Sequence, residues 1–168
     1  MQVDFYILSE ARIESLSRVG AQVISKALAL EFHIHVLGER DFLHHFHEQL
    51  WALPDRFLPS EYAPSEYTDP ASINAQAPIN SQAPINPKVQ PAVLLWQSLP
   101  HAFPFTTPSQ LLINTKALST LPGPIRSFSR IVEMISDDPL AKEAARLRYR
   151  LYQQQKCILQ THTLGPTK

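Results

Sequence analysis

The sequence has few of the cysteines and glycines on which many functional sites are built. Its one cysteine, Cys157, cannot form an internal disulfide or a cysteine-based zinc site, and no sequence-local motif activates it as a nucleophile. The glycines are Gly20, Gly38, Gly123 and Gly165, and none belongs to a GxGxxG or GxxxxGK motif. The sequence therefore has no turn of the kind whose backbone N–H groups hold a phosphate.

Long apolar runs are also missing. No stretch approaches the roughly 20 residues that a membrane-spanning helix needs. The first residues have no basic segment before an apolar run, so we expect no signal peptide and a cytoplasmic location. The chain has 168 residues, of which 44% are hydrophobic and 18% charged. That composition suits one core, and we expect a single domain over residues 1–168.

The net charge is zero, but the charges are unevenly distributed. Residues 1–70 hold five Lys and Arg against eleven Asp and Glu, a net of −6. Residues 139–168 hold six Lys and Arg against one Glu, a net of +5. A general nucleic-acid binder is usually basic overall. A local positive region favours instead a single site for an acidic partner.

Short apolar runs alternate with longer amphipathic segments. The runs predict five strands, at residues 3–8, 32–37, 92–96, 111–114 and 129–135. Apolar residues spaced by three and four predict helices at about 13–30, 41–51 and 138–154, with Asp41 and Asp138 as N-caps and Pro139 in the first turn of the last helix. This order predicts an α/β three-layer domain with a mostly parallel sheet.

The regular pattern stops in the middle of the chain. Ten of the fifteen prolines lie between Pro54 and Pro104, and residues 71–87 carry no charge. Within them the six residues 73–78 recur, slightly changed, as 79–84 and in part as 85–87. Regularly spaced proline excludes both a helix and a central β-strand, so we interpret residues 62–91 as a low-complexity insertion or linker. A tolerated loop expansion is favoured over a partner-binding motif.

Histidines offer a possible metal site. On a helix, His44, His47 and Glu48 share a face, but their order is not HExxH and no fourth ligand is evident. A solvated helix face is the better interpretation, and we expect no metal. His33 and His35 alternate on a predicted strand and point the same way, which favours hydrogen-bonded histidines over ligands.

The last predicted helix has the strongest local pattern. Lys142, Arg146 and Arg150 recur every four residues and form a positive stripe, with Tyr149 beside it. A basic stripe is often only a solvated face, so a binding role is one of two interpretations. Another face of this helix is predicted to pack on the sheet through its apolar residues Leu140, Ala144, Leu147 and Leu151.

Several short motifs, taken in order, are similar to those of a known family. They are Phe5-Tyr6, Leu50-Trp51, residues 57–59, residues 112–114, Arg146-x-Arg148-Tyr149-x-x-Tyr152 and Leu159-x-x-His162. Together they resemble the chi subunit of bacterial DNA polymerase III over most of the chain apart from about 62–91. The chain departs from that pattern at Lys156, where the family commonly has glycine.

The resemblance implies a Rossmann-like α/β domain without nucleotide chemistry, no cofactor and no catalytic residues. It implies an accessory replication subunit that pairs with the psi subunit of the clamp loader and contacts DNA only indirectly. It also implies binding of the acidic carboxy-terminal tail of single-stranded DNA-binding protein, through basic residues that hold carboxylates and apolar residues that bury the tail's end. The matching positions are Trp51, Phe57, Ile135, Lys142, Arg146 and Tyr149.

Two alternatives remain from the sequence. The chain could be a binding module for another protein, such as a repair helicase. The α/β pattern also leaves open a nucleotide-dependent enzyme, which the missing phosphate-binding motifs disfavour.

Overall fold

The computed structural model of the chain describes residues 1–52, 60–63, 93–101 and 109–165. Phe57 and the repeat at 73–87 lie outside these residues. The described strands are β1 (Gln2–Leu8), β2 (His33–Leu37), β3 (Ser60–Tyr62), β4 (Val93–Trp96), β5 (Gln110–Asn114), β6 (Arg130–Ile135) and β7 (Ile158–Leu164). The α-helices are α1 (Ile13–Leu28), α2 (Arg40–Trp51) and α3 (Pro139–Gln154).

The strands form one sheet in the order β3-β4-β2-β5-β6-β1-β7, and every described pairing is parallel. β6 and β7 lie on either side of β1, and α3 connects them. The helix therefore has to cross the face of β1, because a parallel connection leaves one end of the sheet and returns to the other. This connection sets the position of the candidate site.

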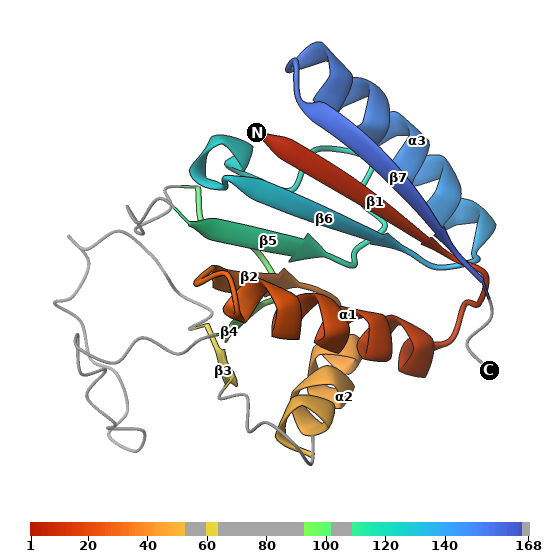
Figure 1. Ribbon diagram of the computed structural model, residues 1–168. Helices are drawn as coiled ribbons and strands as arrows, with labels where there is room; N and C mark the ends of the chain where they lie inside the picture. The colour runs from red at the N-terminus through yellow and green to blue at the C-terminus, as the bar shows by residue number, and fades with distance from the viewer. Residues whose placement is uncertain (53–59, 64–92, 102–108, 166–168) are drawn as a thin grey trace, which may run out of the picture.

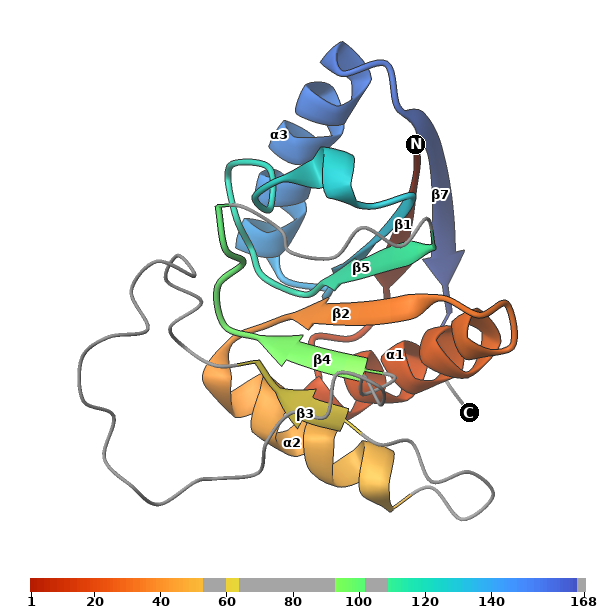
Figure 2. The ribbon, with the colours of Figure 1, turned by 90° about the vertical axis from the view of Figure 1, so that its left-hand side faces the viewer.

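Helices cover both faces of the sheet. α1 and α2 pack together on one face, and α3 packs on the other (Figures 1 and 2). Side chains alternate along each strand, so each face has its own apolar core. Phe46 and Ile24 belong to the α1/α2 side, and Phe5 and Tyr152 belong to the α3 side. The predicted α/β three-layer fold with a parallel sheet is confirmed.

The structure corrects the predicted elements in three places. β3 and β7 were not predicted, and Tyr62 lies in β3 rather than in the expected insertion. Ala63 extends that pairing, because its N–H donates to the Leu95 carbonyl at 2.8 Å. Glu39, not Asp41, is the N-cap residue of α2, and Asp41 lies in the first turn.

The predicted packing face of α3 is wrong. Leu140 is 72% exposed and Leu147 is 40% exposed, although Ala144 is buried as predicted. The buried face runs instead through Ala144, Ala145, Arg148 and Tyr152. A charged residue at the centre of that face hid it from a pattern that counts only apolar positions.

Among the described residues, none of the helices combines the length and the apolar character that a membrane-crossing segment needs.

Candidate functional site

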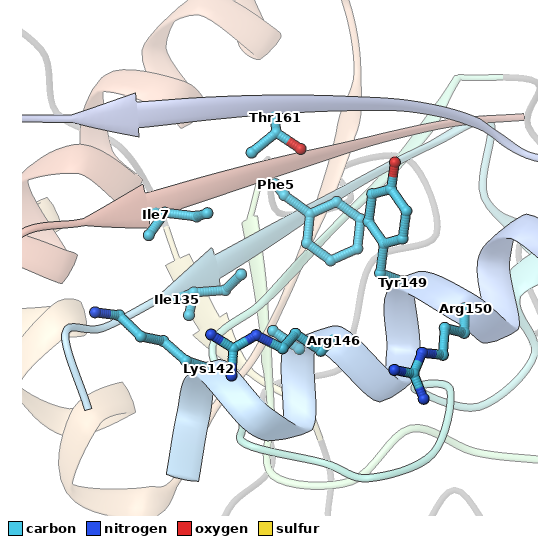
Figure 3. A pocket seen from close by; sticks show the side chains of 9 residues that line it. Phe5, Ile7, Ile135, Lys142, Arg146, Tyr149, Arg150 and Thr161 are labelled. Atoms are coloured by element: carbon cyan, nitrogen blue, oxygen red, sulfur yellow. The ribbon is translucent and has the colours of Figure 1, made fainter. Parts of the chain in front are cut away.

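A cavity of about 430 Å³ lies between α3 and the sheet. Its strand side is formed by side chains of β1, β6 and β7, and its helix side by successive turns of α3 (Figure 3). The lining residues are Phe5, Ile7, Ile135, Lys142, Ala145, Arg146, Tyr149, Arg150 and Thr161. The two sides come from distant parts of the sequence, which the β6–α3–β7 connection brings over β1.

The start of α3 is fixed by a cap next to this cavity. The Asp138 carboxylate accepts a hydrogen bond from the Ala141 N–H at 2.8 Å, and Pro139 occupies the first turn. The first N–H groups of a helix have no partner within it. The Asp138 carboxylate satisfies one of them, and proline lacks the N–H at its own position. The predicted cap at Asp138 is confirmed, and it sets where the basic residues of the following turns lie.

Aromatic and aliphatic side chains form the floor. Phe5 and Ile135 are each 3% exposed, so both are packed into the domain. The Tyr149 ring lies 5.2 Å from the Phe5 ring, centre to centre, at an angle of 53°. Tyr149 is 37% exposed and lines the cavity beside Phe5. Such a surface suits an apolar or aromatic group of a ligand.

Cationic side chains follow α3 along the rim. Figure 3 shows Lys142, Arg146 and Arg150 on successive turns, as the four-residue spacing predicts. Lys142 forms an ion pair with Asp137. Within the described residues, neither Arg146 nor Arg150 forms an ion pair, and both are exposed. Their positive charge is available to an anion at the edge of an apolar floor.

A buried polar network holds α3 against the sheet. Arg148 is 1% exposed and Glu133 is fully buried. The Arg148 Nε and Nη2 atoms donate to Glu133 Oε2 at 3.0 and 2.9 Å. The same oxygen accepts from Asn114 Nδ2 at 2.9 Å, and Glu133 Oε1 accepts from the Tyr152 hydroxyl at 2.7 Å. The network leaves the Glu133 carboxylate fully hydrogen-bonded, as a buried charge requires.

This network has two further consequences for α3. Burial, and next the negative charge of Glu133, raise the pKa of Tyr152, so its hydroxyl remains a hydrogen-bond donor. Arg148 Nη1 also donates to the Leu118 carbonyl, which ties the helix to the loop before β6. Arg148 and Tyr152 therefore face inward, and Arg146 and Tyr149 are turned toward the cavity.

The structure brings four of the six predicted site residues together. Ile135, Lys142, Arg146 and Tyr149 all line the cavity. Trp51 does not line it. It ends α2 in the other helical layer, is 49% exposed and packs edge-on against His47, with ring centres 5.7 Å apart.

Sequence reasoning missed other lining residues. Arg150 was visible in the basic stripe, and its spacing could have placed it at the site. Phe5 was visible as a buried aromatic residue in β1. Thr161 lies in β7, which was not predicted, so no sequence signal pointed to it.

Other titratable clusters have ordinary structural partners. His47 Nδ1 lies 2.8 Å from the Ser60 hydroxyl, and burial lowers the pKa of His47. His44 Nδ1 lies 3.8 Å from Glu48 Oε1 on the exposed face of α2. The described part of the chain contains no group of three or more metal-ligating side chains close enough to share an ion. Near the start of α1, Glu10 Oε2 accepts a hydrogen bond from the Ser15 hydroxyl at 2.5 Å.

The fold and the cavity define a parallel α/β domain whose last helix forms a cationic, apolar-floored pocket. The chain belongs to the DNA polymerase III chi subunit family (HolC), whose family model matches residues 1–160. It is 24% identical over 166 residues to the DNA polymerase III subunit chi of Pseudomonas aeruginosa, an alignment that covers 97% of this chain and 96% of that protein. The family predicted from the sequence is confirmed.

Proposed function

We propose that this chi-family chain is a non-catalytic accessory subunit of the DNA polymerase III holoenzyme. In this proposal its α3 pocket binds the acidic carboxy-terminal tail of single-stranded DNA-binding protein. The observation that carries the proposal is the combination of an apolar floor with Arg146 and Arg150, which have no ion-pair partner within the described residues. Few ligands need both features, and an acidic peptide that ends in an apolar residue is one of them.

The chemistry assigns a role to each side of the pocket. Arg146 holds the terminal carboxylate by charge-assisted hydrogen bonds, and Arg150 and Lys142 attract the acidic residues before it. The terminal aromatic side chain packs between Phe5, Tyr149 and Ile135, the buried part of the pocket. Binding is then strong only when the peptide carries both groups at its end.

Changes to the ligand test this proposal. We expect an acidic peptide that ends in Pro-Phe to bind in a calorimetric titration, and an amidated form of the same peptide to bind about tenfold more weakly. Replacing its terminal Phe by Ala should weaken binding to a similar degree, because the floor loses its aromatic partner. Equal affinity of all three peptides would show that the pocket does not recognise a peptide end.

We also propose the psi subunit as a second partner, through which the chain joins the clamp loader in the cytoplasm. Trp51 and Tyr62 are 49% and 44% exposed and both contact the His47 ring, on a surface remote from α3. That separation supports a chain that engages two proteins at once. If psi co-purifies, the complex should still bind the tail peptide with unchanged affinity. Competition between psi and the peptide would contradict this arrangement. A repair helicase is the alternative partner for the second surface.

A further inference from the structure

Within the described residues, β7 pairs with another strand on one side only. It is the last strand in the described sheet and pairs only with β1. Each of its seven residues is exposed or half-buried, and none is fully buried. A strand at the edge of a sheet presents a row of N–H and C=O groups that another chain can pair with.

The ladder identifies which backbone groups point outward. The Ile158 N–H donates to the Met1 carbonyl at 3.0 Å, and Ile158 lies opposite Gln2. Backbone groups alternate in direction along a parallel strand, so even-numbered residues of β7 bond to β1. The N–H and C=O groups of Leu159, Thr161 and Thr163 therefore point away from the sheet.

The open edge begins at the wall of the α3 pocket. Thr161 lines that pocket, and its side chain points to the α3 face of the sheet. Leu159 and Thr163 share this face by the two-residue period of a strand. In Figure 3 β7 runs along the side of the pocket next to Phe5, so a chain that leaves the pocket past Thr161 meets the outward backbone groups of β7.

The edge also lacks the features that usually prevent pairing. Exposed edge strands are commonly protected by lysine, proline, inward charges or bulges. β7, with the sequence ILQTHTL, contains no Lys, Arg, Asp, Glu or Pro. Lys156 precedes it and Arg150 lies on the adjacent rim, so the surroundings favour an acidic strand.

We propose that the open edge of β7 binds, by strand addition, the extended acidic segment that precedes the terminal residue of a pocket-bound peptide. The inference rests on the proposed function and adds a second contact to it. The pocket recognises the end of the peptide, and the edge recognises the extended backbone of the residues before that end. A peptide long enough to reach both sites gains backbone hydrogen bonds that a short one cannot form.

A proline substitution tests the contribution of the outward backbone groups of β7 separately from that of the pocket. Thr163→Pro removes an outward N–H and leaves the even-numbered ladder to β1 intact, a position where an edge strand tolerates proline. The matched control is Thr163→Ala, which keeps the N–H. We expect Thr163→Pro to bind a long acidic tail peptide about threefold to tenfold more weakly than Thr163→Ala. Both variants should bind a short peptide, cut to the residues that fill the pocket, with equal affinity.

The outcomes separate the two proposals. If neither peptide binds the wild-type chain, the proposed function fails. If both peptides bind but the two variants have equal affinity for the long one, the edge inference alone is overturned. Amide hydrogen exchange on the wild-type chain gives a second test that needs no substitution. The Thr163 amide should become protected with the long peptide and not with the short one, and unchanged exchange with the long peptide would overturn the inference.

Discussion

Glu133 is a charged residue that is fully buried in β6, and its partners explain why it is tolerated. It accepts hydrogen bonds from Arg148, Tyr152 and Asn114, and each of these is itself buried. A buried ion pair adds little net stability over apolar residues of the same volume. Removing one partner is costly, because the other charge is then buried without compensation.

Arg148→Met should therefore lower the free energy of unfolding by about 3–5 kcal/mol. Adding Glu133→Gln should recover much of that loss, since the second change removes the uncompensated charge and keeps an oxygen for the Tyr152 hydroxyl. Arg146→Met, which changes an exposed arginine two residues away, should cost much less. Urea denaturation of wild type, these three variants and Glu133→Gln alone checks this. Additive losses in the double variant would contradict the network.

His35 is neutral in the folded chain because of where it lies. It is 1% exposed, its Nε2 lies 2.6 Å from Gln110 Oε1, and its Nδ1 accepts from Trp96 Nε1 at 3.1 Å. Since Gln110 Oε1 can only accept, the proton belongs on Nε2. Burial lowers the pKa of His35 from 6.5 to about 4, although the Gln110 hydrogen bond opposes that change.

This lowered pKa predicts a loss of stability in acid. Between pH 6.5 and about 4 the unfolded chain binds a proton at His35 that the folded chain does not. The contribution of His35 is therefore complete above pH 6.5 and falls as the pH drops, by roughly 3 kcal/mol in total. His35→Gln should flatten the pH dependence of unfolding in this window, and the control His44→Gln, at an exposed site, should not. The same slope in all three proteins would contradict the prediction.

At the scale of the element, α3 carries two functions on two faces. Ala144, Ala145, Arg148 and Tyr152 fix the helix to the sheet, and the stripe of Lys142, Arg146 and Arg150 borders the pocket. The leucines, which the sequence pattern assigned to the core, take up a third face that is largely exposed. The orientation of the helix thus depends on its polar network more than on its leucines.

Substitutions on α3 distinguish these faces. Leu147→Gln should change the free energy of unfolding by less than about 1 kcal/mol, because Leu147 is 40% exposed. Ala145→Gln, which places a larger polar side chain at a position 5% exposed, should cost several times more. Thermal unfolding of both variants measures the difference. A larger loss of unfolding free energy in Leu147→Gln than in Ala145→Gln would support the packing face that the apolar pattern predicted.

The elements also show which parts of the fold the sequence could predict. Five strands and three helices were predictable because their apolar periods are long and regular. β3 has only three residues, and β7 is an edge strand of mixed polarity, so neither has a clear period. From the sequence alone, an arginine such as Arg148 is expected on the surface, and only the fold shows that Glu133 lies opposite it. Lys156, at the turn before β7, adopts a φ of +57°, a conformation that glycine adopts at least cost.

At the scale of the whole molecule, the sheet order makes the candidate site. β1 is the first strand and β7 is the last described strand, yet they are neighbours, and α3 packs along one face of the sheet between β6 and β7. The sequence could predict the basic stripe and the aromatic residue beside it. It could not predict that Phe5 forms the floor or that Trp51 belongs to the other helical layer, because both facts depend on which strands pair.

The central claim is that the α3 pocket binds an acidic peptide end through Arg146. The most direct measurement is a titration of a labelled acidic peptide ending in Pro-Phe against wild type, Arg146→Ala and Arg18→Ala at two salt concentrations. Arg18 is an exposed arginine of α1, on the other face of the sheet, so it controls for loss of one positive charge. Circular dichroism should show that all three proteins are folded.

We expect Arg146→Ala to lose about 1.5–3 kcal/mol of binding free energy, which is roughly tenfold to a hundredfold in affinity. Arg18→Ala should bind like wild type. Added salt should weaken wild-type binding more than that of Arg146→Ala, because the variant has one screened contact fewer. Equal affinities of wild type and Arg146→Ala at both salt concentrations would contradict the account and leave the basic stripe as a solvated helix face.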